Sequence, residues 1–83
     1  MQAMELFNLV RHEPFQPFRV HLQDGRTFDV RYPHLAAVGV EYFDLGIPDL
    51  DDPDHILCDY VEYLYLPHIT HVEMIDRRAS APE

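Results

Sequence analysis

The sequence predicts a mainly β protein, in which a short N-terminal helix precedes a strongly bent five-stranded antiparallel sheet or a small barrel. Two observations lead to this fold class. Apolar and polar residues alternate on both sides of Asp24-Gly25, which is the strongest short-range signal for a β-hairpin. Further short apolar runs follow, separated by proline, glycine and acidic residues, and 83 residues are enough for one domain with a small core.

Residues 2–12 have the periodicity of a short amphipathic helix. Its apolar stripe consists of Ala3, Leu6, Phe7 and Val10. A helix of this length is marginal alone, so it is expected to dock on the sheet. Pro14 and Pro17 end the helix and lead the chain in extended form into the first strand.

The hairpin of residues 18–32 also has a predictable register. A two-residue loop at Asp24-Gly25 would place core residues opposite polar ones, which a half-buried sheet does not tolerate. A three-residue loop of residues 23–25 is therefore preferred, with Gly25 in the left-handed region. This register pairs Val20 with Phe28, Phe18 with Val30, and Arg19 with Asp29.

Three more strands are expected after the hairpin. The second strand, interrupted at Pro33, resumes with a bend over residues 35–40, and a third strand covers residues 42–47. A rigid acidic loop, 48–55, precedes a long fourth strand over 56–66. A tight corner at Pro67 or His68 leads into a short fifth strand, 69–75. Residues 1–76 then form a single domain, and residues 77–83 a flexible tail.

The fourth strand carries apolar residues on both faces, among them Tyr60, Tyr63 and Tyr65. Closure into a small barrel removes exposed strand edges, but it leaves an outward row of tyrosine and leucine to be covered. This row is expected either to lie under the N-terminal helix or to pair with another subunit. The sequence leaves open which face of the strand is buried.

The chain is strongly acidic, with a net charge of −9, and all six of its basic residues are arginines. Such a domain repels a phosphate backbone, which disfavours nucleic acid, although Arg19 and Arg31 could form a local basic patch on the hairpin. No apolar run is long enough to span a membrane, so the protein is expected to be cytoplasmic and not bound to a membrane. The single cysteine, Cys58, lies in an apolar run and is expected to be a buried thiol.

Candidate chemistry is sparse. The acidic loop offers oxygen ligands for Ca²⁺ or Mg²⁺ at Asp49, Asp51, Asp52 and Asp54. The glycine and the bidentate glutamate of an EF-hand are missing, however, so a solvated turn is favoured over a metal site. No hydrolase or phosphate-binding motif occurs, and we therefore expect no enzymatic activity, catalytic residue or cofactor.

The sequence His68-x-x-His71-x-Glu73 suggests a zinc site at first sight. Residues three apart on a strand point to opposite faces, so His68 and His71 cannot readily bind one ion. His71 and Glu73 do share a face, but two ligands are too few. We expect them to be surface partners.

Two resemblances extend this interpretation. Residues 22–30, Leu-x-Asp-Gly-Arg-x-Phe-x-Val, are similar to the first signature of the Sm-like (Hfq-like) small barrels, an SH3-like architecture, and residues 65–70 are loosely similar to another stretch of that family. The resemblance, over roughly residues 3–75, implies a ring in which the fourth strand pairs with a neighbour's fifth, and RNA binding, although Pro67 replaces the family's lysine. Residues 14–19, 24–26 and 46–53 also resemble short uncharacterised bacterial proteins, which implies no particular activity.

The favoured function is a non-catalytic protein-interaction or assembly module. It would bind a protein partner or a second copy of the chain through the fourth strand or the acidic loop. Two alternatives stay open: an Sm-like RNA-binding ring, and a divalent-metal-binding module that uses the acidic loop. The candidate interaction residues are Tyr60, Tyr63, Tyr65, Arg19 and Arg31.

Overall fold

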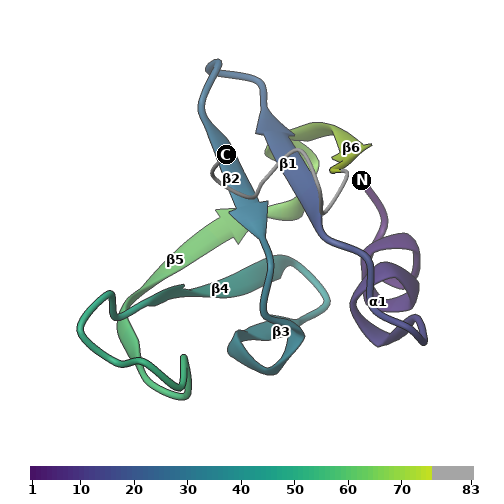
Figure 1. The fold of residues 1–83 in the computed structure, drawn as a ribbon. Helices are drawn as coiled ribbons and strands as arrows, with labels where there is room; N and C mark the ends of the chain where they lie inside the picture. The colour runs from purple at the N-terminus through teal and green to yellow at the C-terminus, as the bar shows by residue number, and fades with distance from the viewer. Residues whose placement is uncertain (76–83) are drawn as a thin grey trace.

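The structure, a computed structural model, describes residues 1–75 and is mainly β, with one short N-terminal helix (Figure 1). The elements are α1 (Ala3–Arg11), β1 (Phe18–Leu22), β2 (Thr27–Val30), η1 (Pro33–Leu35), β3 (Ala36–Val38), β4 (Tyr42–Pro48), β5 (Cys58–Tyr65), η2 (Leu66–His68) and β6 (Ile69–Met74). The strands form two three-stranded antiparallel sheets, with the orders β2-β1-β6 and β3-β4-β5. The tail predicted over 77–83 lies outside the described residues.

The β1–β2 hairpin has the predicted register. Phe18 pairs with Val30, Arg19 with Asp29, and Val20 with Phe28. The loop has three residues, because the amide of Leu22 donates to the carbonyl of Arg26 at 2.9 Å. Gly25 has a φ of 94°, a conformation that glycine adopts without a steric penalty. Both the local alternation and the turn are therefore confirmed.

The predicted second strand is in fact two strands in different sheets. β2 ends at Val30, and Pro33 begins the one-turn 3₁₀ helix η1. After this turn β3 pairs with β4, so that Ala37 lies opposite Asp44 and Val38 opposite Phe43. The prediction of one bent strand was wrong because proline has no amide hydrogen for a ladder and favours a turn. The chain thus changes sheet where it was expected only to bend.

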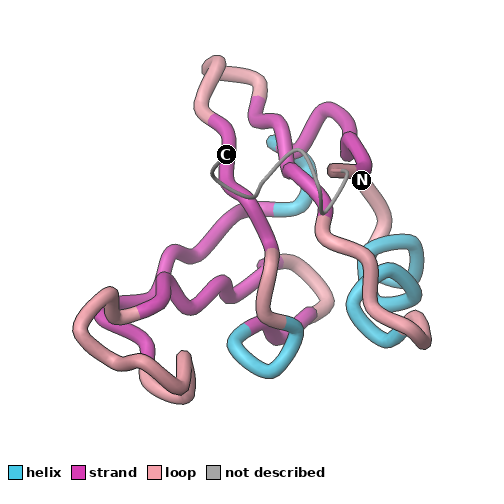
Figure 2. Tube along the Cα trace, viewed as in Figure 1, coloured by secondary structure: helices cyan, strands magenta, loops and turns pink. Residues whose placement is uncertain are grey.

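The chain returns to the first sheet through a second 3₁₀ turn. β5 pairs with β4 along its length, and η2 follows at the predicted corner around Pro67 (Figure 2). β6 then pairs with β1. The chain therefore crosses between the sheets twice, each time through a single 3₁₀ turn with one proline at its first or second position.

The two sheets share one hydrophobic core but do not close into a barrel. β1 and β2 contribute Phe18, Val20 and Val30, whereas β4 and β5 contribute Phe43, Leu45 and Leu64. Within residues 1–75, no strand of the first sheet is hydrogen-bonded to a strand of the second. The expected single five-stranded sheet is thus replaced by six strands in two sheets. None of the helices in this part of the chain is long and apolar enough to cross a membrane.

The helix α1 docks on this core through a narrower stripe than predicted. Leu6 and Val10 are buried, and Ala3 and Leu9 pack partly against the core. Phe7 is 40% exposed, which corrects its assignment to the buried stripe. At 3.6 residues per turn Phe7 lies about 100° round the helix from Leu6, at the margin of the stripe centred on Leu6. The Arg11 guanidinium instead lies over its ring, 5.6 Å from the centroid.

Candidate interaction surface

The strand β5 lies at an edge of the second sheet. β4 pairs with it on one side, from Tyr42 opposite Tyr65 to Pro48 opposite Cys58. No strand among residues 1–75 pairs with its other side. An eight-residue edge strand presents a row of unpaired backbone groups, to which another chain can add a strand.

Apolar side chains crowd the outer face of this edge strand. Tyr63 is 66% exposed, and Val61 and Tyr65 on the same face are also exposed. Tyr42 of β4 lies opposite Tyr65, with the ring centroids 5.2 Å apart. We name these four residues the tyrosine face. Isolated exposed apolar residues are ordinary, but a contiguous group on an unpaired strand is typical of an interaction site.

The third predicted tyrosine lies apart from this face. Tyr60 pairs with Ile47 and so points toward the side of the sheet that carries the core. Its side chain is nevertheless 52% exposed. Tyr42 and Val61 were not predicted as interaction residues. The alternation of Tyr42 with core residues indicates an outward side chain, whereas the face of Val61 was left open, and only the β4–β5 register brings both beside Tyr63 and Tyr65.

A groove of about 330 Å³ runs beside the tyrosine face. It is lined by residues of η1, β3, β4 and β5, among them Ala37, Gly46, Cys58 and Tyr63. Cys58 is exposed, which contradicts the prediction of a buried thiol. The apolar run around it suggested burial, but Cys58 begins β5 at the open end of the sheet, opposite Pro48.

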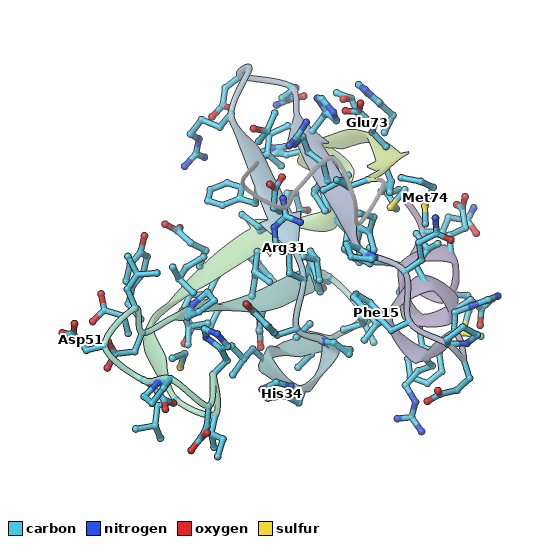
Figure 3. All side chains as sticks on the ribbon, in the orientation of Figure 1. Phe15, Arg31, His34, Asp51, Glu73 and Met74 are labelled. Carbon is cyan, nitrogen blue, oxygen red and sulfur yellow. The ribbon has the colours of Figure 1, made fainter. Side chains whose placement is uncertain are left out.

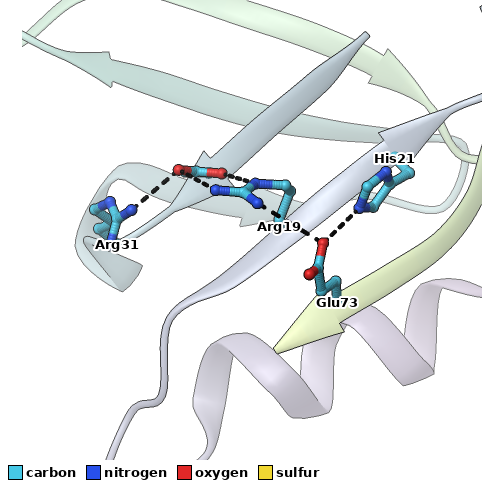
Figure 4. A network of polar contacts seen from close by, with 5 residues as sticks. Arg19, His21, Arg31 and Glu73 are labelled. Atoms are coloured by element: carbon cyan, nitrogen blue, oxygen red, sulfur yellow. Dashed lines mark hydrogen bonds and ion pairs between the residues drawn. The ribbon is translucent and has the colours of Figure 1, made fainter. Parts of the chain in front are cut away.

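The predicted arginines lie on the other sheet, in a network of ion pairs (Figure 4). Arg19 Nε donates to Asp29 Oδ1 at 2.6 Å, and Arg31 Nη2 donates to Asp29 Oδ2 at 3.0 Å. The hydrogen bond from Arg19 lowers the pKa of Asp29 below its ordinary value of 3.8, and the charge of Arg31 adds to the effect. The two arginines share a carboxylate and do not form a free basic patch.

Two histidines continue this network onto β6. Glu73 Oε1 lies 2.9 Å from His21 Nε2 and 3.7 Å from Arg19 Nη1. The His21 ring stacks on that of His71, with centroids 4.1 Å apart. The contact with His21 lowers the pKa of Glu73. Glu73 was expected to partner His71; the β1–β6 register places Glu73 opposite Arg19 and His71 opposite His21, and His71 is a weaker further cause of the lowered pKa of Glu73.

The acidic loop uses its carboxylates to hold its own backbone. Asp52 Oδ2 accepts the amides of Ile56 and Leu57 at 2.8 Å each. These bonds lower the pKa of Asp52, because they favour its charged form. Asp49 Oδ1 accepts the amide of Asp51 at 2.9 Å, and Asp51 itself lies at the outer end of the loop (Figure 3). No group of three metal-ligating side chains occurs within residues 1–75. The loop is thus a self-capped turn.

No protein-family model, curated protein or solved structure matches the chain. The described residues offer an unpaired, tyrosine-rich strand edge on one sheet and a neutralised charge network on the other. The first arrangement suits the binding of a polypeptide, and neither assembles a nucleophile with a base.

Proposed function

We propose that this protein is a non-catalytic interaction module that binds another polypeptide at the free edge of β5. The observation that carries the proposal is the coincidence of the tyrosine face with an eight-residue strand that has one side unpaired among residues 1–75. Backbone groups of the strand supply affinity by strand addition, and alternate side chains supply specificity. Tyrosine is enriched at protein interfaces because it buries a large area with few rotatable bonds.

A second copy of the same chain is the simplest partner. Among residues 1–75 the first sheet has free edges at β2 and β6 and the second at β3 and β5, so β5 and β6 are two of four open edges. Pairing of β5 with β6 of a neighbour would join molecules head to tail, and a closed ring would leave neither the β5 edge nor the β6 edge exposed. The chain forms the β1–β2 hairpin, turns at η1 and returns to the first sheet in β6. This order of elements supports an Sm-like ring as the form of the assembly.

RNA binding by such an assembly is the second candidate function. Its support is the resemblance of the β1–β2 hairpin to the Sm signature. The charge network weighs against it, because Arg19 and Arg31 are already paired with Asp29. Binding of RNA phosphates depends on basic side chains that are free to displace the counterions of the RNA. The net charge of −9 also repels the RNA backbone.

The experiment that tests the proposal measures molar mass by sedimentation or light scattering over a wide range of concentrations. We expect the wild-type chain to self-associate and Tyr63→Lys to shift it toward the monomer, because a charge on an edge strand opposes pairing. The matched control is Val40→Lys, which adds the same charge at a residue that is 89% exposed in the β3–β4 turn.

Two outcomes would count against this function. If the chain stays monomeric and a native pull-down recovers the same partners with wild type and Tyr63→Lys, the β5 edge is not the binding site. If mixed RNA binds at low salt, and Arg19→Ala abolishes that binding while Tyr63→Lys leaves it intact, the RNA-binding function takes its place.

A further inference from the structure

A second cavity, of about 290 Å³, lies away from the tyrosine face. Its apolar wall is formed by residues of β4 and the acidic loop, namely Leu45, Gly46, Ile47, Pro48 and Leu50. Polar side chains enter from the end of β2 and from the loop, namely Asp29, Arg31, Tyr32 and His55. Figure 3 shows Arg31 near the centre of the molecule, between β2 and β4. This volume is at the lower end for ligand sites and has room for one ring with a short substituent.

His55 lines this cavity and carries one buried polar ring atom. Its ring stacks on Tyr32, with centroids 4.8 Å apart, and its backbone carbonyl accepts a hydrogen bond from His34. Its backbone has a φ of 55°, which is uncommon for a residue other than glycine. The Nδ1 atom is buried and, within the described residues, has no hydrogen-bond partner. A buried polar atom without a partner is costly, so a bound group that pairs with it would be favoured.

The other polar groups of the cavity favour an anion. Both oxygens of Asp29 are occupied, Oδ1 by Arg19 and Oδ2 by Arg31 and Arg19. Arg31 uses one nitrogen for this pair, and within residues 1–75 Asp29 is its one hydrogen-bond partner. Nε and Nη1 of Arg31 are therefore left to donate, each as a single charge-assisted hydrogen bond to a carboxylate.

We propose that the cavity binds a carboxylate attached to a small apolar group. The apolar group would lie against Ile47 and Leu50. The carboxylate would accept hydrogen bonds from Arg31 and from Nδ1 of His55, in the tautomer that carries the ring hydrogen on Nδ1. This chemistry occurs in a free aromatic or branched acid and in the last residue of a polypeptide. The cavity is separate from the tyrosine face, so the site does not depend on how β5 pairs.

The test is a titration followed by amide NMR shifts, with benzoate and phenylacetate as free acids and N-acetylphenylalanine as a chain terminus. Each acid is compared with its amide, which has the same shape and no charge. We expect the acids to shift the amides of residues 47, 50 and 55 and to bind at least about tenfold more tightly than the amides. Tighter binding of benzoate or phenylacetate would identify the ligand as a free acid, and tighter binding of N-acetylphenylalanine would identify it as the end of a polypeptide.

Two variants test the assigned contacts. Arg31→Gln is expected to reduce the affinity for acids to that for amides, and Arg26→Gln, at the hairpin tip, is the matched control. His55→Phe preserves a ring that can stack on Tyr32 and removes Nδ1, so it carries the test if Arg31→Gln fails to fold. Equal binding of acids and amides, equal effects of the two arginine variants, or no shifts at millimolar acid would each overturn the proposal.

Discussion

The backbone carbonyl of Leu35 lies directly over Gly46, so that a β-carbon added to Gly46 would stand 2.9 Å from the Leu35 oxygen. The same β-carbon would approach Cys58 Cβ to 3.1 Å. η1 therefore packs on β4 at a distance that only glycine permits. This contact fixes the position of η1, through which the chain crosses between the two sheets. It also fixes Gly46, which lines both the groove beside the tyrosine face and the second cavity.

We expect Gly46→Ala to destabilise the protein, because the first contact is with backbone that cannot rotate away. Overpacking of this kind costs about 1–3 kcal/mol. Urea unfolding would measure the change in the free energy of unfolding. Val40→Ala, at an exposed residue, is the control and should change it by less than about 0.5 kcal/mol. If the two variants are equally stable, η1 is free to shift and the close packing is not a constraint.

The helix offers a comparison between two neighbouring residues. Leu6 is fully buried, whereas Phe7 is 40% exposed beneath Arg11. We expect Leu6→Ala to lower the free energy of unfolding by about 2–5 kcal/mol. Phe7→Ala should cost less than about 1 kcal/mol, even though it removes the larger side chain. Chemical denaturation of both variants measures this, and a larger loss for Phe7 would show that the helix docks by the wider stripe.

Stability at acid pH should depend on Asp29. Its pKa is lower in the folded protein than its ordinary value of 3.8, so its contribution is present above that value. The contribution is lost as the pH falls through the lower, folded pKa. We expect Asp29→Asn to be less stable than wild type near neutral pH, with the difference shrinking between about pH 5 and pH 2.

Urea unfolding at a series of pH values would record this dependence. Asp51→Asn removes the same charge at the tip of the acidic loop and serves as the control. A difference between wild type and Asp29→Asn that stays constant down to pH 2 would contradict the role of the two arginines.

The shape of the acidic loop should depend on Asp52. Asp52→Ala removes the acceptor for the amides of Ile56 and Leu57, so we expect hydrogen exchange at these two amides to become at least severalfold faster. Asp51→Ala should leave their exchange unchanged. Exchange followed by NMR distinguishes the two variants. Equal effects would mean that the charge of the loop, and not the hydrogen bonds of Asp52, maintains its shape.

Local patterns predicted the hairpin well, because its register is decided within fifteen residues. The alternation around Asp24-Gly25 allows one pairing that keeps Val20 and Phe28 on the same face. The split at Pro33 could not be predicted in this way. A period-2 pattern indicates an extended chain on both sides of the proline, but it does not indicate which sheet each part joins.

The candidate surface was predictable in its residue types but not in its arrangement. The tyrosines of β5 stood out from the sequence, yet the face that each one occupies depends on pairing with β4. Tyr60 and Tyr63, three apart on the strand, point to opposite faces, and the register with β4 decides which of the two faces meets the core. The exposure of Cys58 likewise depends on its place at the start of β5, opposite Pro48, which no local pattern records.

The pairing of β6 with β1 has a consequence for the order in which the protein can form during synthesis. A nascent chain that has emerged as far as Tyr65 contains all three strands of the second sheet, but only two of the first. One side of β1 then stays open until residues 69–74 follow. Because this closure joins segments some fifty residues apart, we expect it to be the slow step of folding and the stage most exposed to pairing with a wrong chain.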